Sequence, residues 1–198
     1  MSIILASSSP RRYELFKMIG INDFIVMTDT SAEEIRPGLT PEQAVCDIAL
    51  QKAKNVFNAS SAGMTDHNIT CDDIIIAADT LVYLDNDPLG KPASPDEAVR
   101  MLSRLSGRRH TVFTGVALLQ GSKAVTAAEK TDVYFREISQ NEINAYVDTG
   151  EPMDKAGSYA AQGRGALFIE RIEGEFFNVM GLPLCRLSLM LREFGIIL

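Results

Sequence analysis

The stretch Asp73-Ile74-Ile75-Ile76-Ala77-Ala78-Asp79 decides the fold class of this chain. Its middle is an unbroken apolar run that begins with three β-branched residues, a pattern typical of a strand covered on both faces. A carboxylate directly after such a run is costly to bury without a partner. The stretch therefore predicts a buried strand over residues 73–78 that delivers Asp79 at its C-terminal end.

Toward the N-terminus, residues 2–6 form a second short apolar run and also predict a buried strand. A helix is expected next, because Ser9 can act as its cap and Pro10 suits the first helical position. A polar loop is expected over residues 58–70. Capping boxes predict the starts of three further helices, at Thr40, Ser94 and Ser139.

Toward the C-terminus, we expect a strand over residues 81–84, a long hairpin over residues 110–135, and strands over residues 166–172 and 176–180. Strands alternate with helices early in the chain, and hairpins follow later. This mixture favours an α/β protein with a mixed twisted sheet and flanking helices, in two lobes around a cleft. Since no repeat or linker divides the chain, we expect a single domain over residues 1–198.

The composition excludes several classes of protein. The chain has 198 residues, of which 46% are hydrophobic and 23% charged, and this lies within the globular range. Its 19 Lys and Arg against 26 Asp and Glu give a net charge of −7. Binding to a nucleic acid polymer or to an anionic membrane surface is not expected, because both need a basic face. No apolar stretch is long enough to span a membrane, so we expect a soluble cytoplasmic protein.

The first candidate binding segment is Ser7-Ser8-Ser9-Pro10-Arg11-Arg12, between the first strand and its helix. A helix N-terminus presents unsatisfied backbone N–H groups, and hydroxyls and guanidinium groups add further donors. The segment could therefore hold a polyphosphate. The alternative is a well-capped helix with two solvated arginines.

Four other residues are candidates for chemistry. Lys52 lies on the apolar stripe of its helix, so its ammonium group needs a partner, and Lys91 follows a glycine turn. Each lysine could instead extend its charge into solvent. Asp79 could bind a cation or activate water, or could cap a turn. Glu33 and Glu34 offer a second acidic site, or an exposed loop.

Taken together and in order, the motifs of this chain resemble those of the Maf family of nucleotide pyrophosphatases. Nearly the whole chain, from residue 5 to residue 183, takes part in the resemblance. The motifs are Leu5-Ala6-Ser7-Ser8-Ser9-Pro10-Arg11-Arg12, Ala77-Ala78-Asp79-Thr80, Gly90-Lys91-Pro92, Leu105-Ser106-Gly107, His110, Thr114-Gly115-Val116, Asp154-Lys155-Ala156-Gly157-Ser158-Tyr159, Gln162-Gly163, Asn178-Val179 and Gly181-Leu182-Pro183.

The resemblance implies an α/β fold related to the inosine triphosphate pyrophosphatases. It also implies hydrolysis of a nucleoside triphosphate between its α and β phosphates. Asp79 is then the catalytic acidic residue, acting as a proton acceptor or through a metal, and Glu34 supports it as a metal ligand, with Glu33 as the neighbouring alternative. A divalent cation, Mg²⁺ or Mn²⁺, is expected, because phosphates and hard oxygen ligands suit both. The residues expected to hold the triphosphate are Ser7, Arg12, Lys52 and Lys91.

The resemblance extends to the nucleobase. One branch of the family acts on dTTP and UTP and carries Arg, Thr and Gln at the positions of Arg11, Thr80 and Gln162, and this chain matches all three. A Gln amide can both donate to and accept from a pyrimidine edge. The alternatives are the same reaction on another nucleotide, such as 7-methyl-GTP, and a non-catalytic nucleotide-binding regulator of cell division. A homodimer is also expected from the resemblance.

Overall fold

The computed structural model describes residues 1–28, 36–65 and 67–198. It divides into two compact units, of which unit 1 comprises residues 1–79, 114–129 and 181–198, and unit 2 comprises residues 80–113 and 130–180. Within the described residues, seven strands form one sheet in the order β2-β1-β3-β5-β6-β7, with β4 paired to β3. Both parallel and antiparallel pairs occur, which confirms the predicted mixed sheet.

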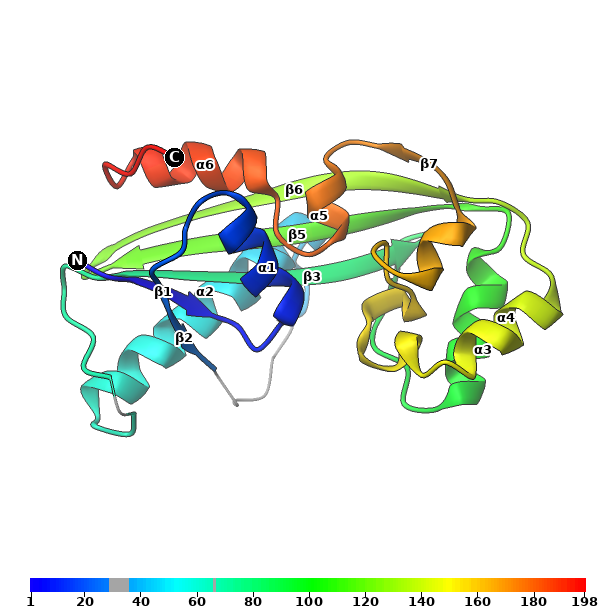
Figure 1. The fold of residues 1–198 in the computed structure, drawn as a ribbon, viewed down its shortest axis with the longest axis horizontal. Helices are drawn as coiled ribbons and strands as arrows, with labels where there is room; N and C mark the ends of the chain where they lie inside the picture. The colour runs from blue at the N-terminus through cyan, green and yellow to red at the C-terminus, as the bar shows by residue number, and fades with distance from the viewer. Residues whose placement is uncertain (29–35, 66) are drawn as a thin grey trace. The chain divides into compact units, whose positions relative to one another are not determined.

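The elements are labelled in Figure 1. Three strands, β3 (Ile74–Leu84), β5 (Arg109–Gln120) and β6 (Lys123–Phe135), contribute residues to both units. The other elements of unit 1 are β1 (Ile3–Ala6), α1 (Pro10–Met18), β2 (Ile25–Met27), α2 (Pro41–Ser61) and α6 (Leu184–Arg192). Those of unit 2 are β4 (Asp87–Leu89), α3 (Pro95–Leu105), α4 (Gln140–Val147), three short 3-10 helices at Glu151–Asp154, Ala156–Ser158 and Arg164–Phe168, β7 (Ile169–Glu173) and α5 (Phe176–Val179).

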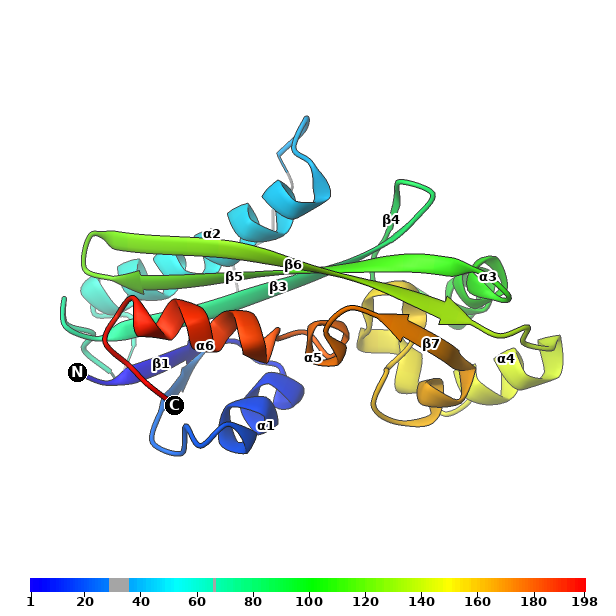
Figure 2. The ribbon, with the colours of Figure 1, turned by 90° about the horizontal axis from the view of Figure 1, so that it is seen from above.

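Unit 1 has helices on both faces of its strands. Figure 2 shows α2 on one side of β1, β3 and β5, and α1 and α6 on the other. Strand β1 pairs in parallel with both β2 and β3, and Ala6 stands opposite Ala77. Because both faces are covered, the apolar run of β3 is continuous, as parallel buried strands require.

The alternation of side chains along β3 determines where Asp79 points. Ile75 and Ala77 belong to the same core cluster as Ala49 and Ala53 of α2. Since side chains two residues apart share a face of a strand, Asp79 continues this row on the α2 side of the sheet. The sequence pattern of β3 therefore places a carboxylate against α2.

Gly115 of β5 brings α2 close to the sheet. A Cβ at this position would lie 2.3 Å from the backbone carbonyl of Val45 and 2.6 Å from the amide nitrogen of Cys46. Any side chain here would overlap the helix backbone, so only glycine allows the observed approach. Val45 precedes Lys52 by seven residues on α2, and this contact thereby sets the level of Lys52 against the strands.

Unit 2 packs its own core from α3, α4, β3, β5 and β6. The largest buried side chains include Leu102, Leu105, Phe135, Tyr159 and Phe168. Strand β3 turns into β4 through a tight hairpin, in which Asp85 and Asn86 both have positive φ angles of 51° and 67°. Asp and Asn tolerate this left-handed conformation better than most residues, which explains their place in the turn.

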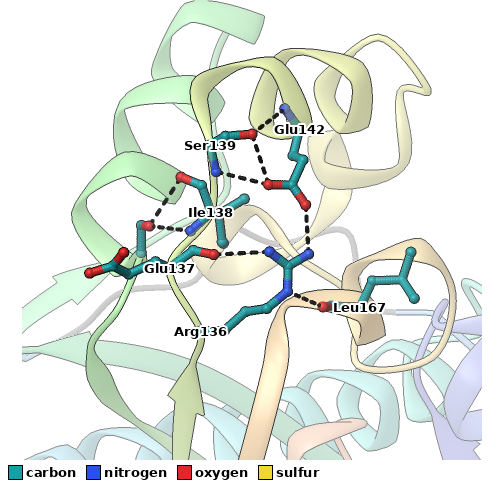
Figure 3. Close-up of polar contacts among 7 residues, drawn as sticks. Arg136, Glu137, Ile138, Ser139, Glu142 and Leu167 are labelled. Atoms are coloured by element: carbon teal, nitrogen blue, oxygen red, sulfur yellow. Dashed lines mark hydrogen bonds and ion pairs between the residues drawn. The ribbon is translucent and has the colours of Figure 1, made fainter.

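Arg136 joins three segments of unit 2 (Figure 3). Its guanidinium group donates to the carbonyl oxygens of Leu167 and Glu137 and to the carboxylate of Glu142. Glu142 also completes the predicted capping box with Ser139 at the start of α4. The hydrogen bond from Arg136, reinforced by those from Ser139, lowers the pKa of Glu142.

The structure corrects several predicted boundaries in the first half of the chain. Helix α2 continues to Ser61, so the loop predicted from residue 58 starts later, because Ser60 is buried and bonds to residues 67 and 69. Ser9 lies at the N-cap of α1, yet its side chain makes no capping hydrogen bond. The capping box at Ser94 is only half formed, since Glu97 bonds to the Ala93 amide.

Two further corrections concern the strands. The predicted strands over residues 73–78 and 81–84 are one strand, β3, which runs without a break through Asp79. Residues 176–180, predicted as a strand from their local apolar pattern, begin with the short helix α5, because long-range contacts override that pattern: the buried side chain of Asn178 donates to the Val112 carbonyl of β5 and to the Thr131 hydroxyl of β6. Residues 166–168 are 3-10 helix, and β7 starts at Ile169.

Candidate functional site

Asp79 and Lys52 form a buried ion pair in unit 1. Lys52 Nζ lies 2.7 Å from Asp79 Oδ1, and the two side chains are only 16% and 8% exposed. Lys52 comes from the face of α2 that packs on the sheet, three residues after Ala49, which lies in the core. The position of Lys52 on the apolar stripe of its helix predicted a partner for this ammonium group, and the structure identifies it as the carboxylate of Asp79.

The second carboxylate oxygen of Asp79 has an unusual environment. Among the described residues, Asp79 Oδ2 is buried and has no hydrogen-bond partner. A buried oxygen that carries charge is costly to leave unsatisfied, and such atoms in folded proteins call for a specific explanation. An oxygen in this state can accept a proton from water or bind a cation.

Asp79 does not lie at the end of its strand as predicted, but it does lie just beyond the end of the parallel pairing of that strand. Asp79 lies inside β3 and not at its end, so the prediction that it ends its strand is wrong, as is the alternative of a turn aspartate. The parallel partner β1 nevertheless stops at Ala6, opposite Ala77. Ser7 and Asp79 therefore both follow the end of the parallel pairing, where ligands bind in open α/β sheets.

Ser7 and Arg12 form a second polar pair in unit 1. Arg12 Nη1 donates to Ser7 Oγ at 3.2 Å, and Arg12 Nε donates to the Gly181 carbonyl oxygen at 2.7 Å. The backbone N–H of Ser9 also donates to Ser7 Oγ, at 3.2 Å. Arg12 thus connects the turn before α1 to the segment that leads into α6.

The hydrogen bonds of Ser7 leave its hydroxyl proton available for a ligand. A serine hydroxyl has two acceptor positions and one proton. Among the described residues, the partners of Ser7 Oγ are Ser9 N–H and Arg12 Nη1, and both are donors, so they occupy the acceptor positions. Ser7 is buried, and its proton therefore calls for an acceptor such as a phosphate oxygen.

Helix α1 begins with an unusual charge pattern. Its first turn contains no acidic residue and carries Arg11 and Arg12 directly after Pro10. Acidic side chains are normally favoured at this end of a helix, because the helix dipole is positive there. Two guanidinium groups in the first turn favour an anionic ligand, in agreement with the predicted phosphate-binding role of this segment.

The remaining candidates lie in unit 2 or outside the described residues. Thr80 follows Asp79 on β3 and is half-buried, while Lys91 and Gln162 are exposed in loops. Within unit 1 the structure brings together Lys52 with Asp79 and Ser7 with Arg12, and Arg11 is half-buried on α1. Glu34, and its neighbour Glu33, lie outside the described residues, so Glu34 as a metal ligand stays a prediction.

The donor set fits a divalent cation shared with a substrate. Among residues 1–28, 36–65 and 67–198, no three His, Cys, Asp or Glu side chains cluster in a way that could hold a metal ion by themselves. Mg²⁺ is commonly bound through one or two carboxylates together with substrate phosphates and water. Asp79 Oδ2, which has no hydrogen-bond partner in the described part of the chain, supplies one such oxygen, so a cation that arrives with a polyphosphate is compatible with this site.

Two glycine positions of the site were missed from the sequence. The Gly181 carbonyl anchors Arg12, and Gly115 lets α2 approach β5. Both glycines stand in the motifs of the family resemblance, which was the available signal, but no sequence pattern relates residue 12 to residue 181.

Among the described helices, none is long and apolar enough to cross a membrane.

His110 is a buried residue in the core of unit 2. Its Nε2 lies 2.8 Å from the hydroxyl of Tyr159, and its ring packs edge-on against Tyr159 and Phe135. Burial lowers the pKa of His110 to about 4, although the nearby carboxylate of Asp132 raises it. The imidazole is therefore neutral near neutral pH and stabilises the core of unit 2.

Comparison with known proteins finds relatives that align over nearly the whole chain. Residues 2–194 match the family described as Maf-like protein. The chain is 48% identical to a dTTP/UTP pyrophosphatase of Pelotomaculum thermopropionicum, over 98% of this chain and 96% of that protein. It is 45% identical to a dTTP/UTP pyrophosphatase of Caldicellulosiruptor saccharolyticus, over 98% and 94% of the two chains.

Solved structures show the same fold at low identity. The Staphylococcus aureus Ham1 protein superimposes with a TM-score of 0.52 at 15% identity, over 98% of this chain and 99% of that one. A HAM1 protein from Coxiella burnetii gives a TM-score of 0.51 at 13% identity, with the same coverage. The predicted likeness to the inosine triphosphate pyrophosphatase-like fold is confirmed, and the family match over residues 2–194 shows that this chain belongs to the Maf family.

Proposed function

We propose that this protein hydrolyses dTTP and UTP to the nucleoside monophosphate and pyrophosphate. The observation that carries the proposal is the buried Asp79 carboxylate, with one oxygen held by Lys52 and the other without a hydrogen-bond partner among the described residues. Two relatives at 45% and 48% identity, aligned over nearly their whole length, bear the name dTTP/UTP pyrophosphatase. The site geometry and the names of the relatives support the same reaction class.

The chemistry follows from the charges of the site. A water molecule attacks the α-phosphorus, a new P–O bond forms, and the bond from that phosphorus to the bridging oxygen breaks, which releases pyrophosphate. Asp79 Oδ2 accepts a proton from the attacking water. Lys52 keeps the carboxylate oriented through Oδ1, so that Oδ2 remains directed away from the ion pair.

Phosphate binding is assigned to donors near the start of α1. The Ser7 hydroxyl donates its proton to a phosphate oxygen, and Arg12, held by Gly181, supplies positive charge beside it. Lys91 of unit 2 is proposed as a further phosphate ligand, and so is Lys52, whose ammonium group also pairs with Asp79. Preorganised donors of this kind stabilise negative charge better than mobile water does, because no reorganisation is needed during the reaction.

A divalent cation, Mg²⁺ or Mn²⁺, completes the proposal. Glu34 and the phosphate oxygens of the substrate would hold it, and Asp79 would join them where its Oδ2 binds the ion instead of accepting the proton. When bound, such an ion neutralises part of the charge on the phosphates. Removal of the ion with a chelator is therefore expected to stop pyrophosphate release, and readdition of Mg²⁺ or Mn²⁺ to restore it.

Nucleobase selection is assigned to Arg11, Thr80 and Gln162. Uracil and thymine present acceptor, donor and acceptor groups along O4, N3–H and O2. A glutamine amide can accept from N3–H while it donates to one carbonyl oxygen, and an arginine can donate to the other. These hydrogen bonds are made with an uncharged base, so the arrangement disfavours the cationic 7-methylguanine.

The test is pyrophosphate release from dTTP, UTP, CTP, dGTP, ITP and 7-methyl-GTP, each with Mg²⁺, with Mn²⁺ and with chelator. Selective, metal-dependent release from dTTP and UTP, with monophosphate as the second product, is the expected result. Preference for another nucleotide would overturn the substrate assignment. Absence of turnover with all six, by folded protein, would overturn the enzymatic reaction itself and favour a nucleotide-binding regulator.

A further inference from the structure

The loop that carries Gln162 is held at both ends by two side chains of unit 2, Tyr146 and Glu151. The Tyr146 hydroxyl accepts a hydrogen bond from the Ala160 amide at 3.1 Å and donates to Glu151 Oε1 at 2.9 Å. Past Gln162, Glu151 Oε1 accepts from the Gly165 amide at 3.1 Å. We call Tyr146 and Glu151 the loop clamp, because together they connect the residues before and after Gln162.

Glu151 uses both carboxylate oxygens in this clamp. Its Oε2 accepts from the Arg164 amide at 3.1 Å, next to the Gly165 contact of Oε1. Desolvation is the largest influence on the pKa of Glu151 and raises it. The hydrogen bonds from Gly165, Arg164 and Tyr146 together outweigh desolvation, so the pKa is lowered. The side chain is therefore an ionised acceptor for every one of these donors.

The loop also fits closely around the clamp. Gly163 has a φ of 128°, and a Cβ at this position would lie 2.8 Å from Glu151 Oε1. A Cβ on Gly165 would lie 2.6 Å from the Ala160 carbonyl oxygen and 2.9 Å from the Tyr146 hydroxyl. Glycine at both positions allows the backbone to approach Tyr146 and Glu151, so the path of the loop is set by these two side chains.

We infer that Tyr146 and Glu151 are positioning residues that determine nucleobase selectivity by fixing the loop of Gln162. Gln162 itself is exposed, while Ala160 before it and Gly165 after it are held through the clamp. A hydrogen bond to a base edge discriminates only while donor and acceptor stay aligned. The inference rests on the proposed function, because it assumes that Gln162 contacts the base.

The clamp is expected to affect selectivity more than catalysis. Lys52, Asp79, Ser7 and Arg12 lie in unit 1, whereas Tyr146 and Glu151 lie in unit 2. Loosening the Gln162 loop removes binding energy specific to the uracil edge. Release of pyrophosphate from a nucleotide that gains little from Gln162 should change much less.

The experiment compares Tyr146→Phe and Glu151→Gln with a matched control, Tyr134→Phe. Tyr134 also donates its hydroxyl to a glutamate, Glu173 Oε2 at 2.8 Å, but this pair is exposed and lies on β6 and β7. The measurement is kcat/KM for UTP and CTP in each variant, with the melting temperature as a check of folding. Phe for Tyr removes a single oxygen, so Tyr146→Phe is the variant least disruptive to folding.

In Tyr146→Phe and Glu151→Gln, the ratio of kcat/KM for UTP to that for CTP should fall about tenfold, the effect of one or two hydrogen bonds. The fall should come mainly from a higher KM for UTP. The control Tyr134→Phe should keep the wild-type ratio. In a Gln162→Ala background, Tyr146→Phe should change the ratio no further, since the clamp acts through Gln162.

Two results would overturn the inference: an unchanged ratio in folded Tyr146→Phe, or a further change of the ratio in the Gln162→Ala background. Failure of the proposed function looks different, because wild-type protein would then turn over neither UTP nor dTTP. In that case, hydrogen exchange at the Ala160, Arg164 and Gly165 amides still tests the clamp. Exchange that is no faster in Tyr146→Phe and Glu151→Gln than in wild type would refute it.

Discussion

Lys52 Nζ lies 2.7 Å from one carboxylate oxygen of Asp79, and the other oxygen of Asp79 is buried without a hydrogen-bond partner among the described residues. The ion pair keeps the carboxylate in one orientation. The second oxygen is left to accept a proton or bind a cation. This asymmetry connects the fold of unit 1 to its proposed chemistry.

Asp79→Asn is expected to lower pyrophosphate release from UTP by at least about 100-fold, because an amide cannot accept the proton from water. Binding of a non-hydrolysable UTP analogue should persist. The checks are steady-state turnover and calorimetric titration. Asp87→Asn is the control, since Asp87 also pairs with a basic residue, Arg104 at 2.6 Å, on the exposed surface. Wild-type turnover in Asp79→Asn would contradict the role of Asp79.

Lys52→Met is expected to destabilise the protein by about 3 kcal/mol, because it leaves the buried carboxylate of Asp79 without its counter-charge. The double variant Lys52→Met/Asp79→Asn should be more stable than Lys52→Met alone, since no buried charge then remains unpaired. Urea unfolding of the wild type, both single variants and the double variant measures this coupling. Additive effects in the cycle would mean that the pair is not coupled in solution.

Gly115→Ala is expected to cost about 1–3 kcal/mol of stability, the range seen for overpacking. Its methyl group would overlap the backbone of Val45 at 2.3 Å, so α2 has to move, and Lys52 with it. The free energy of unfolding and the rate of UTP turnover should both decrease. Gly90→Ala is the control for stability, because a Cβ at Gly90 meets no atom within 4 Å. Equal stability of the two variants would argue against a close α2 contact.

Gln162→Glu is expected to reduce kcat/KM for UTP and dTTP by about tenfold or more, because a carboxylate cannot donate to a carbonyl oxygen of the base. Gln162 is exposed, so the melting temperature should hardly change. Kinetics on the nucleotide panel, together with a thermal melt, separate the two effects. If the order of substrates stays as in the wild type, Gln162 does not read the base.

Stability is expected to depend on pH through His110. Its pKa is about 4 in the fold, where burial disfavours the charged form, and the unfolded chain has the ordinary value of 6.5. Below pH 6.5 the unfolded state therefore binds more protons, and stability falls as the pH drops toward 4, by on the order of 3 kcal/mol. Urea unfolding at neutral pH and at about pH 4.5 measures the loss. His110→Gln should lose less over the same interval, and an equal loss would exclude His110 as the cause.

Local sequence signals predicted most helices and the long hairpin. The capping boxes at Thr40 and Ser139 form as expected, and the hairpin over residues 110–135 corresponds to β5 and β6. These features depend on neighbours in the chain, so periodicity and capping patterns are enough to predict them. The same logic failed for residues 176–180, where the long-range bonds of Asn178 decided the conformation.

In the candidate site, too, the sequence predicted local features and only the packing of distant segments decided the rest. The need for a partner at Lys52 and at Asp79 followed from an ionisable residue on an apolar stripe and a carboxylate after an apolar run. Nothing in the sequence pattern paired one with the other, because residues 27 positions apart meet only through the packing of α2 on β3. Likewise, the family resemblance pointed to Gln162, while Tyr146 and Glu151 carried no signal of their own.

By itself, then, the sequence determined the α/β class, the family and the residue types available for phosphate chemistry, since these depend on composition, period and motif order. Only the tertiary structure decided that β3 runs unbroken through Asp79 and that Lys52 pairs with one carboxylate oxygen of Asp79. It also decided that Arg12 donates to the carbonyl oxygen of Gly181. The physical reason is that a buried charge or hydrogen-bonding group must be satisfied wherever packing brings a partner, and packing joins residues that are remote in the chain.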